Sequence, residues 1–311
     1  MAQYNQTWVN EFILLGLSND QKTQIYLFVI FLAMYLVTML GNFLIIHLIR
    51  LDTRLHTPMY FFLSVLSIVD ICYMNSTVPQ MLIHFLSSRK SIPFCSCVFQ
   101  FYISLGLAGT EFFLLGAMAY DRYVAVCYPL HYTVIMHGGL CIALAAACWT
   151  AGFLNSLMET IITFRLPLCK NIINHFVCET LAVLRLACVD ISFNKVMVTF
   201  SVFVVLMFPC ALVLFSYAQI VRAILRIRST QGRRKAFGTC ASHLTVVSLC
   251  FGATIFTYMW PRATSTVELE KMISIFYTVV APMLNPLIYS LRNKEVMSAM
   301  KKALGRFSEE K

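Results

Sequence analysis

The chain has 311 residues, of which 59% are hydrophobic and only 12% are charged, and its mean hydropathy is +0.75. This composition excludes a soluble domain, and 12 glycines and 9 prolines are too few for a fibrous or disordered chain. The net charge of +10 lies in basic clusters beside apolar segments, which is typical of cytoplasmic loops rather than of a nucleic-acid-binding surface. We therefore predict a polytopic membrane protein with no nucleic-acid partner.

The N-terminal residues 1–23 are expected to lie outside the cell. They lack a basic opening and carry Glu11 and Asp20, which is unlike a cleavable signal peptide. Asn5 begins an Asn-Gln-Thr glycosylation sequon, which has a meaning only on the outer side. A second sequon, at Asn75, falls within an apolar segment and is therefore discounted.

Seven segments are long and apolar enough to cross a hydrocarbon core of ~30 Å, which takes about 20 helical residues. They cover residues 24–49, 58–86, 96–127, 140–163, 196–226, 236–260 and 269–291. The dense basic run from Arg222 to Lys235 places the loop after the fifth segment in the cytoplasm. The prediction is an all-α, seven-helix transmembrane domain over 24–291, with an extracellular N-terminus.

The C-terminal tail, residues 292–311, is short and basic and is expected to be cytoplasmic. Its apolar residues recur at helical spacing: Val296, Met300, Ala303, Leu304 and Phe307. Such a stripe predicts an amphipathic helix that lies along the inner leaflet and contacts membrane lipid.

Five cysteines fall on the proposed outer side, where disulfides can form. They are Cys95, Cys97, Cys169, Cys178 and Cys188. Five thiols allow two disulfides and leave one cysteine over, and the residues alone leave the pairing open.

Three stretches resemble the signatures of one family. Residues 118–132 contain Asp121 and Arg122 at the end of the third segment, and ionised groups there could simply mark the membrane edge. The whole run Met-Ala-Tyr-Asp-Arg-Tyr-Val-Ala-Val-Cys-Tyr-Pro-Leu-His-Tyr is more specific. With Pro-Met-Tyr-Phe-Phe-Leu at 58–63 and Pro-Met-Leu-Asn-Pro-Leu-Ile-Tyr at 282–289, it resembles the olfactory receptors, which are rhodopsin-like G-protein-coupled receptors. Residues 77–82 and the moderate outer loop favour the tetrapod-type class.

The resemblance implies two disulfides, Cys97–Cys178 and Cys169–Cys188, with Cys95 as the odd thiol. It also implies a ligand cavity in the outer halves of the helices. The implied lining is Ser104, Leu105, Ala108, Gly109, Ser201, Val205, Phe251, Thr254, Tyr258 and Thr278. Small and hydroxyl residues also occur at helix-to-helix contacts in membranes, so packing is an alternative role for each of them.

The expected ligand is a small, neutral or weakly polar volatile molecule. A receptor for a cationic amine would be expected to carry an acid near position 104, where this chain has Ser104. The implied partner is a stimulatory olfactory G protein that raises cyclic AMP, and the implied location is the plasma membrane of olfactory cilia.

The resemblance also assigns residues to activation at the inner side. They are Asp121, Arg122, Tyr123, Tyr217, His243, Asn285, Pro286 and Tyr289. In the resting form Asp121 is expected to hold Arg122. For His243, a hydrogen-bonded core histidine is favoured over a pH sensor.

An internal polar site is expected between the helices, because acids within apolar segments are costly unless they are paired, protonated or bound to a cation. Its members are Asn42, Asp70, Glu111 and Asn285. The resemblance implies that this site can hold sodium, and a shared proton with a water network is an equal alternative. No other cofactor is expected.

Other kinds of function are disfavoured. No nucleotide loop, Ser/His/Asp arrangement or zinc spacing fits the topology, so we predict no catalytic site and no enzyme. His175 and Cys178 could suggest a metal site, but the disulfide is the better use of Cys178. Glu179 departs from the aspartate common in the family, and Glu268 to Lys271 are interpreted as a solvated outer loop. A receptor for a lipid or peptide, and a transporter or channel, remain as alternatives.

Overall fold

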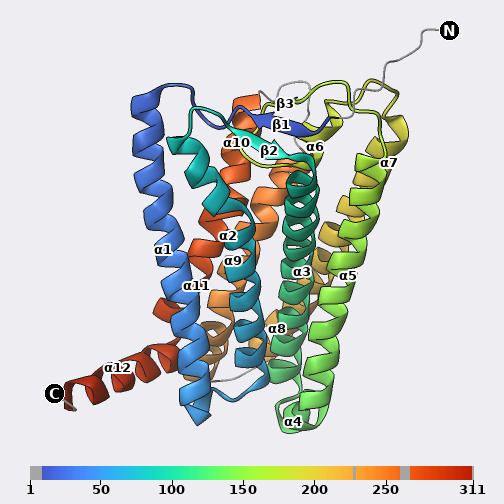
Figure 1. Cartoon of the computed structure of the whole chain (residues 1–311). Helices are drawn as coiled ribbons and strands as arrows, with labels where there is room; N and C mark the ends of the chain where they lie inside the picture. The colour runs from blue at the N-terminus through green and yellow to red at the C-terminus, as the bar shows by residue number, and fades with distance from the viewer. Residues whose placement is uncertain (1–8, 227–228, 260–266, 310–311) are drawn as a thin grey trace.

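The protein is a bundle of seven membrane-spanning helices, described by a computed structural model over residues 9–226, 229–259 and 267–309 (Figure 1). The first four spans are α1 (Gln21–Leu51), α2 (Pro58–Leu86), α3 (Phe94–Cys127) and α5 (Gly138–Phe164). The fifth is α7 (Ser192–Val202) with α8 (Phe208–Arg226), the sixth is α9 (Thr230–Met259), and the seventh is α10 (Val267–Ile275) with α11 (Ala281–Arg292). The predicted seven-helix architecture is confirmed, although α9 begins at Thr230 rather than at residue 236.

Six of these spans, within the described residues, are long and apolar enough to cross a membrane. The remaining one, α9, carries the shorter apolar stretch Cys240–Gly252. Short helical pieces follow or join the spans at both sides of the bundle. They are η1 (Thr53–Leu55), η2 (Pro129–His131), α4 (Tyr132–Ile135) and α6 (Thr180–Leu184).

Two spans contain a π turn near the middle of the bundle. The turn η3 (Phe203–Met207) joins α7 to α8, and η4 (Phe276–Val280) joins α10 to α11. A π turn widens the helix locally and is frequent at functional sites. Both turns contribute residues to the cavity described below, so the widening matters for the site.

The bundle centre is packed by glycines where α3 crosses α5. Gly152 of α5 faces Gly106 and Thr110 of α3, and a Cβ atom at Gly152 would lie 2.7 Å from the Gly106 carbonyl oxygen. Only glycine allows two backbones to approach this closely in a membrane bundle. The close crossing fixes the position of α5, which carries part of the cavity wall.

A small β-sheet covers the outer end of the bundle, and the sequence analysis did not foresee it. Its strands are β1 (Glu11–Leu14), β2 (Ser91–Pro93) and β3 (Ile172–Ile173), in the order β2-β1-β3 (Figure 1). β1 is antiparallel to β2 and parallel to β3. Phe12 and Leu14 are buried against Ile92 and Ile173, so the N-terminal segment is packed as part of the fold.

The seventh span begins as a helix where a solvated loop was expected, which corrects that interpretation. Residues 267–275 form α10, and Lys271 Nζ donates to the Gly16 carbonyl oxygen at 2.8 Å. Glu270 pairs with Arg185 of the long outer loop at 2.8 Å. These contacts join the N-terminal segment, the outer loop and the seventh span.

The tail forms α12 (Lys294–Glu309), which leaves the base of the bundle sideways (Figure 1). Val296 and Ala299 are buried against the bundle and Met300 packs beside them. The predicted helix is therefore present. The side chains of the other stripe members, Ala303, Leu304 and Phe307, lie outside the described residues.

Candidate ligand cavity and signalling core

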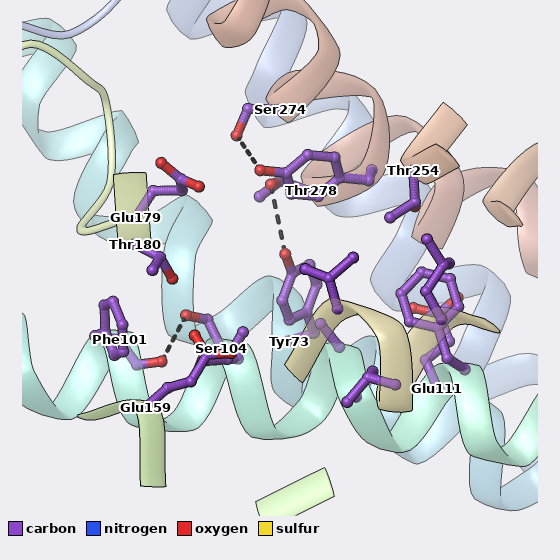
Figure 2. A pocket seen from close by; sticks show the side chains of 18 of the residues that line it. Tyr73, Phe101, Ser104, Glu111, Glu159, Glu179, Thr180, Thr254, Ser274 and Thr278 are labelled. Carbon is purple, nitrogen blue, oxygen red and sulfur yellow. Dashed lines mark hydrogen bonds between the residues drawn. The ribbon is translucent and has the colours of Figure 1, made fainter. Parts of the chain in front are cut away.

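A cavity of about 140 Å³ lies in the outer half of the bundle. Its walls come from α2, α3, α5, α7, η3, α9, α10, η4 and α11, and residues 177–180, which lead into α6, roof it (Figure 2). Eight of the ten predicted ligand residues line it: Ser104, Leu105, Ala108, Gly109, Ser201, Val205, Thr254 and Thr278. The residues of the third segment that the resemblance implied as lining therefore lie at this cavity.

The other two predicted ligand residues, Phe251 and Tyr258, are not among the residues that line the cavity in the described part of the chain. Phe251 is buried, but it packs edge-to-face against Phe112 at a ring-centroid distance of 5.2 Å, and Phe112 is the residue that lines the cavity. Phe251 thus supports the wall from behind, which corrects its assignment. The side chain of Tyr258 lies outside the described residues.

Three hydroxyl groups in the cavity wall already donate their single proton to the protein. Ser104 Oγ donates to the Gln100 carbonyl oxygen at 2.6 Å, and Thr254 Oγ1 donates to the Cys250 carbonyl oxygen at 2.8 Å. Ser201 Oγ donates to Asn155 Oδ1 at 2.9 Å. Because a hydroxyl has one proton and two lone pairs, these groups are left as acceptors.

Two acids that the sequence analysis did not assign to the cavity also line it. Glu159 of α5 is 5% exposed, and the side chains of Ser201, Thr180 and Asn155 surround its carboxyl group. Glu179 of the outer loop lies at the same end of the cavity, opposite Glu111 (Figure 2). Glu159 is an acid inside an apolar segment, which is the signal that identified Asp70 and could have identified Glu159 as well.

Glu179 has a structural role besides facing the cavity. Its Oε2 accepts hydrogen bonds from the backbone nitrogens of Leu181 at 3.1 Å and Ala182 at 3.2 Å, so it caps α6. Burial, and to a lesser degree the nearby charge of Glu270, raise the pKa of Glu179 to about 6. This carboxyl group therefore titrates closer to neutral pH than an exposed glutamate does.

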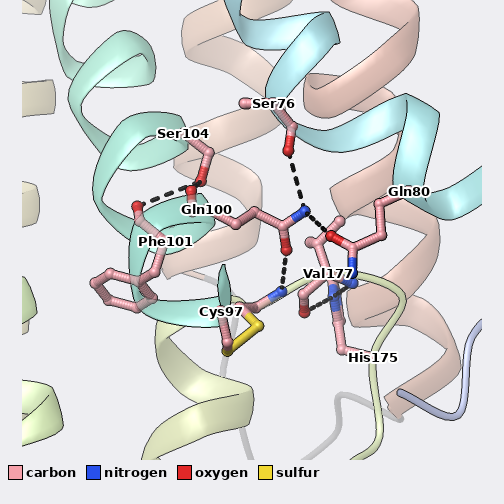
Figure 3. Close-up of a disulfide and its surroundings, with 9 residues drawn as sticks. Ser76, Gln80, Cys97, Gln100, Phe101, Ser104, His175 and Val177 are labelled. Carbon is pink, nitrogen blue, oxygen red and sulfur yellow. Dashed lines mark hydrogen bonds between the residues drawn. A yellow bond between two sulfur atoms is a disulfide. The ribbon is translucent and has the colours of Figure 1, made fainter. Parts of the chain in front are cut away.

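The roof is held to the bundle by a disulfide and one glutamine. Cys97 of α3 is bonded to Cys178 of the loop, and the backbone nitrogen of Cys178 donates to Gln100 Oε1 at 3.1 Å (Figure 3). Gln100 Nε2 donates to the Ser76 carbonyl oxygen at 3.0 Å and to Gln80 Oε1 at 3.2 Å. One side chain thus joins α2, α3 and the roof.

The remaining outer cysteines and the loop histidine follow the expectations. Cys169 is bonded to Cys188, and Cys95 is free and exposed, so both predicted pairings are confirmed. His175 is buried and stacks on Phe176, and burial lowers the pKa of His175 to about 4. No group of three metal-ligating side chains occurs in the part of the chain that the structure describes.

Below the cavity, one amide joins two acids. Asn285 Nδ2 lies 3.1 Å from Asp70 Oδ2 and 3.2 Å from Glu111 Oε1. Two buried carboxylates this close cannot both carry a charge without a cation or a shared proton. Asn42 Oδ1 is buried and has no hydrogen-bond partner among the described residues. The two carboxylates are hard oxygen donors of the kind that a cation such as sodium takes, and Asn285 faces both of them with its amide nitrogen.

At the inner side, Arg122 and Asp121 form a buried ion pair. Arg122 is 5% exposed, and its Nε donates to Asp121 Oδ2 at 3.1 Å. Asp121 Oδ1 also accepts from Tyr132 Oη in the second inner loop at 2.7 Å. Tyr123, also predicted for activation, points elsewhere: its ring packs against Tyr128 at a centroid distance of 5.7 Å.

Four further residues predicted for activation lie in α8, α9 and α11. His243 Nε2 lies 3.1 Å from the Leu115 carbonyl oxygen, and His243 Nδ1 lies 2.8 Å from Tyr217 Oη. The Tyr289 hydroxyl is buried without a hydrogen-bond partner in the described residues. Pro286, inside α11, is buried and faces Gly41 of α1.

Comparison with known proteins identifies the family. A family model described as "Olfactory receptor" matches residues 31–306. The dog olfactory receptor-like protein OLF3 is 62% identical over 309 residues, covering 99% of this chain and 98% of its own length. Human olfactory receptor 2F1 is 60% identical, with the same coverage. The chain belongs to the olfactory receptor family.

This olfactory receptor also shares its fold with a solved structure. Squid rhodopsin superposes with a TM-score of 0.70 over 93% of this chain and 87% of that chain, at 15% sequence identity. The receptor is thus a multi-pass membrane protein with the architecture of a G-protein-coupled receptor. It is a signalling receptor and not an enzyme, as predicted.

Proposed function

We propose that this receptor binds a small, neutral or weakly polar volatile ligand in the outer cavity and activates a stimulatory olfactory G protein, which raises cyclic AMP. The observation that carries the proposal is the cavity of about 140 Å³ with its mostly apolar wall. A cavity of about 150 Å³ is large enough for a molecule such as benzene. A volatile molecule of that size fits, whereas a peptide or a lipid chain does not.

Binding would be transmitted by a change in population between two arrangements of the helices. A ligand shifts such an equilibrium only by binding one arrangement more tightly than the other. In the resting arrangement Asp121 holds Arg122, and His243 joins α9 to α3. In the active arrangement the inner end of α9 moves away, and Arg122, Tyr217 and Tyr289 rearrange to bind the G protein. The unpaired Tyr289 hydroxyl gains a partner in this step.

The acid pair would hold a sodium ion in the resting form. Asp70 and Glu111 supply the charge, with Asn285 and the orphaned oxygen of Asn42 as neutral members. Such an ion would neutralise one of the two carboxylates, and the other would still need a proton. Replacement by Asp70→Asn should abolish any stabilisation of the purified receptor by sodium over potassium. Equal stabilisation in the variant would exclude this ion site.

The proposed location is the plasma membrane of olfactory cilia. Residues 1–23 would lie outside, with a glycan on Asn5, which is outside the described residues. Residues 24–291 would span the membrane, and residues 292–311 would lie at the inner leaflet. An Asn5→Gln variant should migrate faster on a gel, as the wild type does after enzymatic removal of glycans.

A volatile-ligand panel with a cyclic AMP readout tests the proposal. Cells that carry the receptor and the stimulatory G protein should respond to at least one volatile, and cells without that G protein should not. Filling the cavity by Ala108→Phe should move the half-maximal concentration at least tenfold higher, because Ala108 lines the cavity. Ligand-evoked current in cells that lack the G protein would indicate a channel instead.

A further inference from the structure

Several polar groups that face the cavity are left as hydrogen-bond acceptors. The hydroxyl protons of Ser104, Thr254 and Ser201 are donated to protein oxygens, at 2.6, 2.8 and 2.9 Å respectively. Glu159 and Glu179 add carboxyl oxygens to the same wall. An aldehyde or an ether offers only hydrogen-bond acceptors, so it would find no donor at these groups.

Glu159 can still accept from a ligand: Ser201, Thr180 and Asn155 already interact with its carboxyl group, and a carboxylate has about four acceptor sites. Glu159 is only 5% exposed, it comes from a span, and its carboxyl group faces the cavity near Ser104 (Figure 2). Asn155 lies one helical turn before it on the same face of α5, and Asn155 Oδ1 is occupied by Ser201. The Asn155 amide group is therefore left to orient Glu159.

The neighbouring Glu179 makes a donor ligand more favourable. Its Oε2 is used by the backbone of α6, so this carboxyl group is held in place beside the roof. Glu159 and Glu179 are like charges that act on one another at the same end of the cavity. A donor bound at Glu159 compensates for the desolvation of its carboxyl group, which an acceptor cannot do.

We propose that Glu159 is the specificity-determining residue of the cavity, and that the receptor selects ligands with an O–H or N–H donor at one end. This inference rests on the proposed function, since it names the ligand chemistry of the same cavity. The apolar part of the ligand lies toward Val202, Val205 and Phe112 at the other walls. An alcohol or an amine supplies the same donor chemistry.

The test uses a matched series of six-carbon ligands: the primary alcohol, the primary amine, the aldehyde and the methyl ether. On wild-type receptor, the alcohol or the amine should act at concentrations at least tenfold lower than the aldehyde and the ether. If the amine is more potent than the alcohol, the preferred donor ligand is charged. If the alcohol is more potent, the preferred donor ligand is neutral. An aldehyde or ether as potent as the alcohol and the amine overturns the inference.

The variant Glu159→Gln tests the residue itself, because the amide adds an N–H donor in place of a carboxylate oxygen. In this variant, the ratio of the half-maximal concentration of the aldehyde to that of the donor ligand should fall at least tenfold. The control Glu268→Gln removes an exposed acid that is not part of the cavity wall. It should leave the ratio of the two half-maximal concentrations unchanged. If this ratio of half-maximal concentrations is unchanged in Glu159→Gln, the assignment to Glu159 is overturned.

A second variant keeps the test decisive if Glu159→Gln does not reach the cell surface. Glu159→Asp retains the charge but withdraws the acceptor by one methylene, so it should weaken responses to the donor ligand at least fivefold and leave those to the aldehyde unchanged. If Glu159→Asp weakens the responses to the donor ligand and to the aldehyde equally, the inference is overturned. Responses confined to volatiles without a donor refute the inference but keep the proposed function. Silence toward every volatile refutes both.

Discussion

Tyr217 of the fifth span and His243 of the sixth lie face to face, with Tyr217 Oη 2.8 Å from His243 Nδ1. Their ring centroids are 5.9 Å apart and the planes differ by 11°. His243 Nε2 faces the Leu115 carbonyl oxygen, which can only accept, so Nε2 carries the proton and Nδ1 accepts from tyrosine. One histidine therefore joins three spans at the level where α9 has to move.

Replacement of this histidine should favour the active arrangement. His243→Phe retains a planar ring but loses both hydrogen bonds, each worth about 1 kcal/mol. Losing both bonds, about 2 kcal/mol together, changes a two-state equilibrium roughly thirtyfold, so basal cyclic AMP should rise severalfold at equal surface expression. His56→Phe, at an exposed inner position, is the matched control. A fall in basal signal with normal surface expression would contradict this role for His243.

The thermal stability of the receptor should depend on pH through Glu179 in the long outer loop. Burial raises its pKa in the folded protein to about 6 from the ordinary value of 4.5, so the folded protein binds the proton more tightly than the unfolded chain does. This contribution is fully present below pH 4.5 and is lost as the pH rises through 6. The purified receptor should therefore melt at a higher temperature at pH 5.0 than at pH 7.5.

The matched variant isolates that contribution. Glu179→Gln keeps an oxygen to cap α6 but does not titrate, so its melting temperature should change less over the same pH range. His175 does not contribute there, because its pKa is about 4, and the other charges near Glu179 are Glu159, Glu270 and Arg185. An identical pH response in wild type and variant would assign the dependence to another group.

The crossing of α3 and α5 should tolerate no added methyl group. A Cβ atom at Gly152 would lie 2.5 Å from Thr110 Oγ1 and 2.7 Å from the Gly106 carbonyl oxygen, both on α3. Gly152→Ala should therefore lower stability by about 1–3 kcal/mol, the usual cost of overpacking. Gly252→Ala places its Cβ in open space and should not destabilise. Thermal unfolding in detergent compares the two, and equal melting temperatures would refute the close crossing.

The sequence was sufficient for the features that rest on local patterns. Within the described part of the chain, six of the spans are long apolar stretches. The cavity residues Ser104, Ala108 and Gly109 were implied by the resemblance. The pairing of the disulfides came from resemblance, since the five outer cysteines alone allowed several pairings. The Asp121–Arg122 pair was recognised because neighbouring residues made the motif long.

Features that depend on long-range contacts were not predictable in this way. β1 is four residues long and pairs with residues 91–93 and 172–173, so no local signal marks it. Ser104 favoured a neutral ligand over a cationic amine, and no local pattern showed that α5 brings Glu159 to the same wall. Phe251 was assigned by resemblance, and the structure shows Phe112 standing between it and the cavity.

The measurement that tests the signalling account most directly is the cyclic AMP response of Arg122→Ala to the most potent volatile, at surface expression equal to wild type. Arg122 is buried at the inner side and bound to Asp121, so its loss should leave ligand binding in the outer cavity intact and abolish the rise in cyclic AMP. A flat dose–response curve is the predicted result. A normal rise in cyclic AMP from the variant would contradict the account.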